Sequence, residues 1–413
     1  MNSSKEARTD GIGGGREPVE PSVRYLVRRV VTVGSSYIAD RVRGCLARSA
    51  TATPTGRTEV TRDWLTAALC AGTAGAEVED FETFDVSSGT AHRFGIRVSY
   101  NDVGRHANLP TDIFAKTTHG FRQRLLLGFS KVLNGEPTFY TTFRPRLDIE
   151  APNGYHGVWD DRSWRSITLM EDISASKGVT FLSPIEPLSR PHVEDLLSNL
   201  AAMHGRFWDS EDLRTHGLRD SLDVVSWPDR LVGLRSRSVV GEKRAIQVIP
   251  EALHGRASEI FDATLRSLSN DRALTPTLLH GDPHAGQIYR TADGRIGLAD
   301  WQVVQRGRWV FDVAYTLNTA LSVENRRDWG EELIAFYLDR LAEAGGEKLD
   351  FDAAWLEYRR HAFYPYIAWV FTIGRATYQP KYQPDAYSLA IIERAANAIV
   401  DLGAFEALAT TTP

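Results

Sequence analysis

Cysteine is scarce in this chain of 413 residues, which contains only Cys45 and Cys70. Two cysteines are too few for a disulfide framework or a cysteine-rich metal site, and we expect free thiols in a reducing compartment. Long apolar runs are also missing, since none approaches the roughly 20 residues that a membrane-spanning helix needs. The first residues lack the basic and then apolar pattern of a secretory signal. These absences predict a cytoplasmic protein without a membrane span.

A strong excess of one charge is absent as well. Lysine and arginine number 48, and aspartate and glutamate number 53, so the formal net charge is -5. This balance gives no reason to expect a nucleic-acid partner. With 42% hydrophobic and 24% charged residues, the composition is that of an ordinary globular protein. A chain of 413 residues can bury a large core, and its length favours two lobes or domains.

The most informative stretch of the chain begins at residue 277. An apolar run leads into a loop in which Gly281 and Pro283 flank the acid Asp282. Glycine and proline disfavour regular structure, so we expect Asp282 on a loop that follows a strand. An amide, Gln287, stands five residues later, and a turn at Asp293-Gly294 reverses the chain.

The second strand of this predicted hairpin ends at Asp300. The hairpin therefore brings Gln287 and Asp300 to the same end, close to Asp282. Two carboxylates and an amide suit a hard, oxygen-ligated ion such as Mg²⁺ better than zinc. Kinases use such a set: one Asp orients the acceptor hydroxyl and takes its proton, while an amide and a second Asp hold metal ions.

The sequence from His280 to His284, His-Gly-Asp-Pro-His, resembles the catalytic loop of the aminoglycoside phosphotransferase and choline kinase superfamily. Asp300-Trp301-Gln302 resembles the metal-binding motif of the same superfamily, in the form most similar to its ecdysteroid-kinase-like branch. The resemblance implies that Asp282 is the catalytic residue and that Gln287 and Asp300 are metal ligands. It also implies ATP and Mg²⁺ as cofactors.

The resemblance assigns further residues to the nucleotide. Lys116 closes an apolar strand and corresponds to the lysine that grips the α- and β-phosphates, with Glu136 as its acidic partner. The small-residue turn containing Ser88, Gly89 and Thr90 is where a nucleotide-covering loop would lie. Two more residues, Met170 and Glu171, end a later strand at the place where adenine meets the chain.

The implied fold is α+β: a bilobal, protein-kinase-like fold with an antiparallel β-rich N-lobe and a mainly helical C-lobe. We expect a disordered tail, a basic amphipathic helix and a linker in residues 1–58. The nucleotide-binding lobe is expected at 59–172 and the helical catalytic and acceptor-binding lobe at 173–413. The amphipathic helix, from Val23 to Ala47, is expected to pack on its own domain, or else to bind a membrane surface or act as a targeting peptide.

Strands are expected at 78–86, 92–100, 112–117, 155–159 and 166–170, and helices at 121–133, 191–208, 255–269, 325–345, 351–373 and 384–406. The polar and irregular pattern of residues 213–250 says little about their structure. The resemblance also suggests Asp312 as a brace for the catalytic loop and His204 as a structural residue beneath it. Only about a dozen residues separate Asp300 from Asp312, too few for the activation segment of a protein-substrate kinase, which favours a small-molecule acceptor.

The predicted function is an ATP- and Mg²⁺-dependent O-phosphotransferase that phosphorylates a hydroxyl of a small molecule. One alternative is a kinase-like nucleotide-binding protein without turnover, because Gln287 stands where the family usually has asparagine. Another is an aminoglycoside-type resistance kinase. Residues 355–382 contain aromatic and basic residues and only one acid, Glu357, whereas a site for polycationic aminoglycosides needs clustered carboxylates. Aromatic residues at helical spacing also fit a simple core role.

Overall fold

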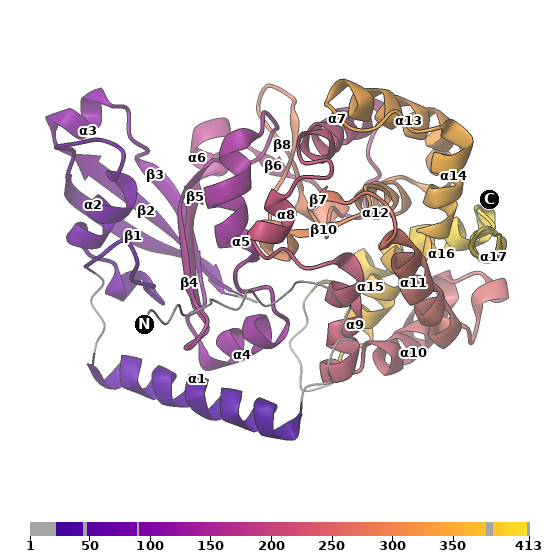
Figure 1. Cartoon of the computed structure of the whole chain (residues 1–413), viewed down its shortest axis with the longest axis horizontal. Coiled ribbons are helices and arrows are strands. Elements are labelled where there is room, and N and C mark those ends of the chain that lie inside the picture. Colours follow the sequence, from indigo (N-terminus) through magenta and orange to yellow (C-terminus); the bar gives the residue numbers. More distant parts are fainter. Residues whose placement is uncertain (1–21, 44–47, 89–90, 377–382, 411–413) are drawn as a thin grey trace, which may run out of the picture.

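The structure is a computed structural model, and it describes residues 22–43, 48–88, 91–376 and 383–410. Figure 1 shows a part built on a β-sheet at one end of the molecule and a mainly helical part at the other. We call these parts the sheet lobe and the helical lobe. Helix α1 (Val23–Arg43) lies along the outside of the molecule, beside α4 (Phe121–Phe129) of the sheet lobe.

The sheet lobe is built on five antiparallel strands in the order β1-β2-β3-β5-β4. Their bounds are β1 Val78–Ser88, β2 His92–Tyr100, β3 Asp112–Thr117, β4 Gly154–Asp160 and β5 Arg165–Glu171. Helix α2 (Arg62–Leu69) supplies Trp64 to the buried cluster on one face of this sheet. Ala115 of β3 belongs to that cluster, so Lys116 points to the opposite face, because successive residues of a strand alternate.

Short elements complete the sheet lobe and connect it to the helical lobe. They are α3 Asp102–His106, α5 Gly135–Thr138, α6 Ile173–Lys177 and β6 Thr180–Phe181. The residues before α2, which composition suggested to be a linker, are packed against the sheet lobe. The carbonyl oxygen of Ala52 accepts a hydrogen bond from the indole of Trp64 at 3.2 Å, and that of Pro54 accepts one from the hydroxyl of Thr117 at 2.8 Å.

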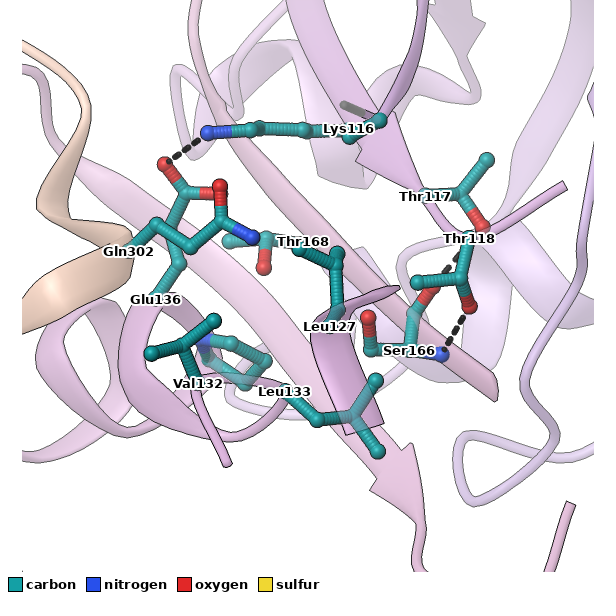
Figure 2. Close-up of a pocket in the computed structure, with 12 residues that line it drawn as sticks. Lys116, Thr117, Thr118, Leu127, Val132, Leu133, Glu136, Ser166, Thr168 and Gln302 are labelled. Carbon is teal, nitrogen blue, oxygen red and sulfur yellow. Dashed lines mark hydrogen bonds and ion pairs between the residues drawn. The ribbon is translucent and has the colours of Figure 1, made fainter. Parts of the chain in front are cut away.

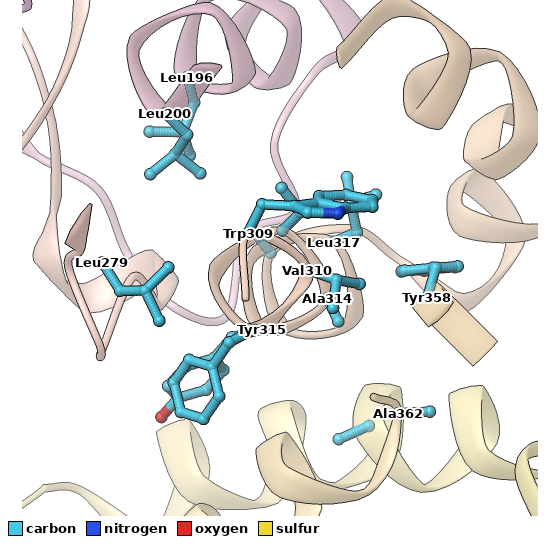
Figure 3. Packing of buried hydrophobic residues seen from close by; sticks show 14 of the residues in the cluster. Leu196, Leu200, Leu279, Trp309, Val310, Ala314, Tyr315, Leu317, Tyr358 and Ala362 are labelled. Atoms are coloured by element: carbon cyan, nitrogen blue, oxygen red, sulfur yellow. The ribbon is translucent and has the colours of Figure 1, made fainter. Parts of the chain in front are cut away.

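The helical lobe surrounds one fully buried helix, α12 (Val310–Ala320). Figure 3 shows this helix end-on, with Leu200 of α7 on one side and Tyr358 of α14 on another. The other helices are α7 Arg190–Arg206, α8 Asp212–Thr215, α9 Ser221–Val232, α10 Leu234–Ala245, α11 Ala257–Asp271, α13 Val323–Glu343, α14 Phe351–Arg360, α15 Phe363–Ile373, α16 Asp385–Asp401 and α17 Ala404–Ala409. Every residue of α12 is buried, so this helix forms the centre of the core, although it also carries polar residues such as Asp312 and Asn318.

Four short strands frame the loop that contains Asp282, at the junction of the lobes. β7 (Thr277–Leu279) pairs with β10 (Gln305–Gly307), and β8 (Ile288–Arg290) pairs with β9 (Ile296–Leu298). The hairpin expected around Asp293-Gly294 is thereby confirmed, and Gly294 takes a φ of 93° in its turn. The predicted fold class, an antiparallel sheet lobe followed by a mainly helical lobe, is also confirmed.

Some of the predicted helix boundaries are wrong. The single helix expected over 351–373 is divided into α14 and α15, because Pro365 lacks an N–H group and is tolerated only in the first turn of a helix. The helix expected over 384–406 is likewise divided, at Gly403, whose φ is 52°. Residues 213–250, whose pattern says little, are largely helical. Within the described ranges, no helix has both the length and the apolar character needed to cross a bilayer.

Candidate active site

Three charged side chains from separate elements meet between the lobes. The ammonium group of Lys116, on β3, lies 3.1 Å from a carboxylate oxygen of Glu136, on α5, and 2.6 Å from one of Asp300. Figure 2 shows Lys116 extending from its strand toward Glu136, with the side chain of Gln302 beside them. The structure therefore brings together two residues predicted to bind nucleotide and one predicted to bind metal.

Burial and charge act against each other in this cluster. Burial disfavours the ammonium form of Lys116, but Asp300 and Glu136 outweigh it and raise the pKa of Lys116. Burial likewise disfavours an ionised Asp300, yet the positive charge of Lys116 lowers the pKa of Asp300 to about 2. Both groups are therefore charged at neutral pH. The backbone at Asp300 has a φ of 60°, and this left-handed conformation, which aspartate tolerates, turns the chain directly after β9.

The loop that contains Asp282, which is predicted to be catalytic, is held in place by Asp312 of α12. One carboxylate oxygen of Asp312 accepts a hydrogen bond from the backbone N–H of His280 at 2.6 Å, and the other accepts one from Gly281 at 3.0 Å. His204 lies 3.4 Å from the same carboxylate, and its other ring nitrogen contacts the hydroxyl of Tyr337 at 2.7 Å. The predicted brace by Asp312 and the structural position of His204 are confirmed.

Gly281 is required by the sharp turn of this loop. Its φ is 85°, and a Cβ added there would lie only 2.4 Å from the carbonyl oxygen of Val303. A side chain at this position would both strain the backbone and displace the segment that follows Asp300. Steric crowding and the positive φ therefore explain why glycine precedes Asp282, and the sequence pattern alone did not reveal this.

Asp282 is the acid that the loop presents, and its side chain is 32% exposed. The protein around Asp282 shields its carboxylate from water and so raises the pKa of Asp282 to about 7. The hydroxyl of Tyr315 donates a hydrogen bond to the carboxylate, which lowers the pKa and partly offsets the effect of burial. Asp300 and Asp312 raise the pKa further through their negative charge. A carboxyl group with a pKa near 7 is suited to exchange a proton with an acceptor hydroxyl at neutral pH.

His284 lies beside Asp282, with its Nε2 atom 3.7 Å from a carboxylate oxygen of Asp282. The backbone N–H of Gly286 donates to the Nδ1 atom of His284 at 3.0 Å, so Nδ1 acts as an acceptor. Burial lowers the pKa of His284 to about 3, which leaves the ring neutral. A neutral ring with Nδ1 already engaged can direct its Nε2–H group toward Asp282.

The two predicted metal ligands lie at one end of the β8–β9 hairpin. The backbone N–H of Ala299 donates to the carbonyl oxygen of Gln287 at 2.9 Å, which places Gln287 next to Asp300. The described residues contain no cluster of three or more His, Cys, Asp or Glu side chains arranged for a metal ion. One carboxylate and one amide nevertheless fit Mg²⁺, which commonly takes few protein ligands and completes its shell with phosphate oxygens and water.

The remaining predicted nucleotide residues fall into three groups. Met170 is buried in the main core beneath the strand end. The carboxylate of Glu171 accepts hydrogen bonds from the backbone N–H of Asn153 at 3.0 Å and from the hydroxyl of Ser176 at 2.7 Å. A side chain engaged in this way braces the connection between the lobes. Ser88 ends β1, whereas Gly89 and Thr90 lie outside the described residues.

The aromatic residues between 355 and 376, whose helical spacing fits either a core or a pocket, belong mostly to the core. Tyr358 and Tyr366 are fully buried, and the hydroxyl of Tyr358 donates to the side chain of Asn318 at 2.7 Å. Trp369 is buried in the core as well, and its ring packs edge-on against His284 at a centroid distance of 4.9 Å. Tyr378 and Tyr382 lie outside the described residues.

Two residues that the sequence did not single out lie within this site. Arg93 of β2 stands directly opposite Lys116 in the β2–β3 register, and cross-strand partners lie on the same face of a sheet. Its positive charge contributes to the low pKa of Asp300. The hydroxyl of Tyr315, on α12, donates a hydrogen bond to Asp282 and accepts one from the indole N–H of Trp369 at 3.1 Å. Arg93 lies on a predicted strand, but its position opposite Lys116 depends on the strand register, and no sequence signal indicates Tyr315.

The chain belongs to a family of phosphotransferases. The profile described as the phosphotransferase enzyme family matches residues 139–359, more than half of the chain and a range that includes Asp282, Asp300 and Asp312. This membership supports phosphotransfer to a small molecule as the activity. A search of curated proteins finds no match.

Several solved structures are similar to this chain. Choline kinase from Cryptosporidium parvum is 12% identical, with a TM-score of 0.49, over 78% of this chain and 91% of that chain. Choline kinase LicA from Streptococcus pneumoniae is 14% identical, with a TM-score of 0.43, over 79% and 94%. Macrolide 2'-phosphotransferase from Brachybacterium faecium is 16% identical, with a TM-score of 0.40, over 79% and 94%.

The hydrogen bond from Tyr315 leads to a prediction about pH dependence. Tyr315→Phe removes a donor that stabilises the carboxylate of Asp282, so the pKa of Asp282 should rise above about 7. The acidic limb of kcat/KM should move to higher pH by about one pH unit, as expected for a lost hydrogen bond worth about 1–1.5 kcal/mol. A ¹³C-NMR titration of aspartate-labelled protein measures the same change without an acceptor. Tyr364→Phe, at a neighbouring ring 5.5 Å from Tyr315, is the matched control, and equal titration curves for the two variants would contradict the prediction.

Proposed function

We propose that the protein is an ATP- and Mg²⁺-dependent O-phosphotransferase that phosphorylates a hydroxyl group of a small molecule. The observation that carries this proposal is the meeting of Lys116, Glu136 and Asp300 beside the loop of Asp282. In phosphoryl transfer the protein acts mainly by positioning the reactants and stabilising charge. A fixed cation, a metal-binding acid and an acid with a pKa of about 7 supply these needs.

Each residue has a proposed role in this reaction. Lys116 holds the α- and β-phosphates and is kept in place by Glu136. Asp300 and the amide oxygen of Gln287 hold Mg²⁺, which when bound neutralises charge on the phosphates. Asp282 orients the acceptor hydroxyl and takes its proton. Arg93, on the same face of the sheet as Lys116, adds a second positive charge for the phosphates.

The adenine-binding part of the proposal rests on Met170 and Glu171. Because the carboxylate of Glu171 is engaged by Asn153 and Ser176, we assign the contact with the base to the backbone of this segment and not to that side chain. Within the superfamily, the Asp-Trp-Gln form at Asp300 supports a place near the ecdysteroid-kinase-like branch.

The alternative of a nucleotide-binding protein without turnover rests on Gln287, whose side chain is one methylene longer than asparagine. The backbone hydrogen bond between Ala299 and Gln287 holds Gln287 next to Asp300. This position favours an active enzyme over a binding protein without turnover, because the amide can still reach a metal ion held by Asp300. A metabolite screen tests the proposal: with ATP, Mg²⁺ and the protein, at least one hydroxylated compound should gain the mass of one phosphoryl group. Products formed equally without ATP, or no product from a broad library while Mg-ATP binds, would contradict it.

The acceptor is predicted to be neutral or apolar, such as a sterol, polyketide or glycoside, and not a polycation. Tyr315, Trp369 and the neutral ring of His284 lie around Asp282, and α15, the helix that supplies Trp369, contains no acidic residue. We therefore expect weak or no phosphorylation of kanamycin-like aminoglycosides in a coupled assay. Saturable phosphorylation of an aminoglycoside with a KM in the micromolar range, within the common span of enzyme KM values of about 1 μM to 1 mM, would instead support a resistance kinase.

A further inference from the structure

Helix α1 is attached to the sheet lobe by one face only. Val33 is fully buried in a cluster with Leu127 and Trp164. The carboxylate of Asp40 forms an ion pair with the buried guanidinium of Arg124 at 2.8 Å. These contacts, and the stacking of Arg29 over the ring of Trp164 at 4.3 Å, hold the helix along the outside of the lobe, as Figure 1 shows.

The opposite side of α1 is apolar and exposed to solvent. Val23, Val27, Val31, Ile38 and Val42 are 75%, 56%, 61%, 64% and 79% exposed. Their spacing of four, four, seven and four residues places them in one stripe of a helix with 3.6 residues per turn. Apolar side chains gathered in a stripe of this kind mark an interaction site more often than single exposed ones do.

Positive charge flanks this stripe. Arg24, Arg28 and Arg41 are exposed, and none of them forms an ion pair with any residue that the structure describes. The only acid in α1 is Asp40, which faces inward and is neutralised by Arg124. The outer side of α1 is therefore apolar and cationic, although the whole chain carries a net charge of -5.

We propose that α1 binds the surface of an anionic lipid membrane and attaches the enzyme to it. An amphipathic helix with this pattern lies in the plane of the interface, with its apolar stripe among the acyl chains and its arginines at the lipid phosphates. The stripe lies opposite the face that holds the helix to the lobe. Binding is therefore possible without detaching α1 from the folded protein.

A second copy of the chain fits this surface less well. A helix of 21 residues is about 31 Å long, and a stripe about 10 Å wide covers about 300 Å². A stable dimer needs about 800 Å² from each partner. A twofold contact would also bring the arginines of α1 close to their own copies, which repel one another. The small area of the stripe and the positive charge of α1 therefore both favour an anionic membrane over a second copy of the chain.

Sedimentation with lipid vesicles tests the proposal directly. The full-length protein should sediment with vesicles of phosphatidylcholine and phosphatidylglycerol and much less with phosphatidylcholine alone. Binding should decrease as salt rises from about 0.1 M to about 1 M, because the screening length shortens from about 10 Å to about 3 Å. Failure to bind anionic vesicles at low salt would overturn the proposal. The test requires no turnover, so it is independent of the proposed enzymatic function.

Two sets of variants separate the apolar and cationic contributions. Val27→Asp, Val31→Asp and Ile38→Asp together should abolish vesicle binding and leave Tm unchanged, since these side chains contact solvent. The matched control carries the same changes at exposed positions elsewhere, Val103→Asp, Val240→Asp and Val400→Asp. Equal loss of binding by both triple variants would overturn the assignment to α1. So would a dimer, detected by light scattering, that the α1 variant dissociates.

Arg24→Gln, Arg28→Gln and Arg41→Gln together should weaken binding to anionic vesicles by about 100-fold, because each arginine near such a surface contributes a factor of about five. The control triple variant, Arg62→Gln, Arg214→Gln and Arg266→Gln, changes the net charge equally at exposed positions on other elements. It should bind like the wild type. If both variants weaken binding to the same extent, attraction depends on total charge and the proposed surface is wrong.

Discussion

Asp282→Asn is expected to lower kcat by about 10² to 10⁴, the range typical for removing a general base. The amide keeps the size of the side chain and can still contact Tyr315, but it cannot take a proton from the acceptor hydroxyl. Affinity for Mg-ATP should remain close to that of the wild type, because Lys116, Glu136 and Asp300 are untouched. Turnover is measured on the acceptor found by the screen, and nucleotide affinity by calorimetry.

Asp293→Asn is a suitable control for this experiment, since Asp293 lies at the exposed turn of the β8–β9 hairpin. It makes the same chemical change in the same segment and should leave kcat unchanged. Turnover by Asp282→Asn within a few-fold of wild type would remove Asp282 from the mechanism, and a parallel loss of Mg-ATP affinity would indicate that the loop itself has been disturbed.

The same substitution is expected to stabilise the fold as pH rises. Burial raises the pKa of Asp282 to about 7, compared with about 3.9 in an unfolded chain. Between these values the folded protein binds the proton more tightly, so the free energy of unfolding decreases as the pH rises from about 4 to about 7. Asparagine does not ionise, so the variant does not lose stability as the pH rises through this range. We expect Asp282→Asn to gain about 1–3 kcal/mol in stability at pH 8 and little near or below about pH 4.

Thermal denaturation of both proteins across this pH range provides the measurement. The difference in Tm between Asp282→Asn and the wild type should grow with pH and level off above the folded pKa. A difference that does not depend on pH would show that Asp282 titrates normally in the folded protein. Together with the loss of turnover, the expected gain would identify Asp282 as a residue retained for activity at a cost in stability.

Asp300→Ala is expected to weaken Mg-ATP binding by about 10²- to 10³-fold, since removing one member of a buried charge contact costs about 3–4 kcal/mol. The substitution removes the proposed metal ligand and also the acid that lies 2.6 Å from Lys116. Lys116 keeps its pair with Glu136, so ATP without Mg²⁺ should bind about as well as before, or better. This contrast between the two ligands distinguishes a metal-binding role from a structural one.

Calorimetry with ATP in the presence and absence of Mg²⁺ measures both affinities. Gln287→Asn should be tolerated, because it retains an amide oxygen at the predicted auxiliary position. Asp293→Ala, in the turn of the same hairpin, should bind Mg-ATP normally. If Asp300→Ala also binds Mg-ATP as the wild type does, the assignment of the metal site to Asp300 is wrong.

The local parts of the fold could be predicted because they depend on short-range patterns. Alternating apolar residues identified the strands of the sheet, and the Asp293-Gly294 turn identified the β8–β9 hairpin. The loop around Asp282 follows from glycine and proline placement together with the resemblance to a known catalytic loop. The helix boundary at 360–363 could also have been predicted, since Pro365 is incompatible with a continuous helix there.

Contacts between distant segments were beyond the reach of these patterns. The placement of Tyr315 against Asp282 depends on how α12 packs beneath the loop that contains Asp282. The cross-strand position of Arg93 depends on the register of two strands. The aromatic residues of α14 and α15 have the spacing of either a core or a pocket, and only the surrounding helices decide that most are buried.

The sequence by itself therefore determined the chemical groups of the site, their order along the chain and the family to which they point. The tertiary structure decided which of those groups meet, because the contacts of Lys116 with Glu136 and Asp300 span 20 and 184 residues. It also decided the pKa of Asp282, which depends on burial and on charges from other elements. For α1, the sequence specified an amphipathic helix, but only packing shows that its apolar stripe at Val27, Val31 and Ile38 remains uncovered.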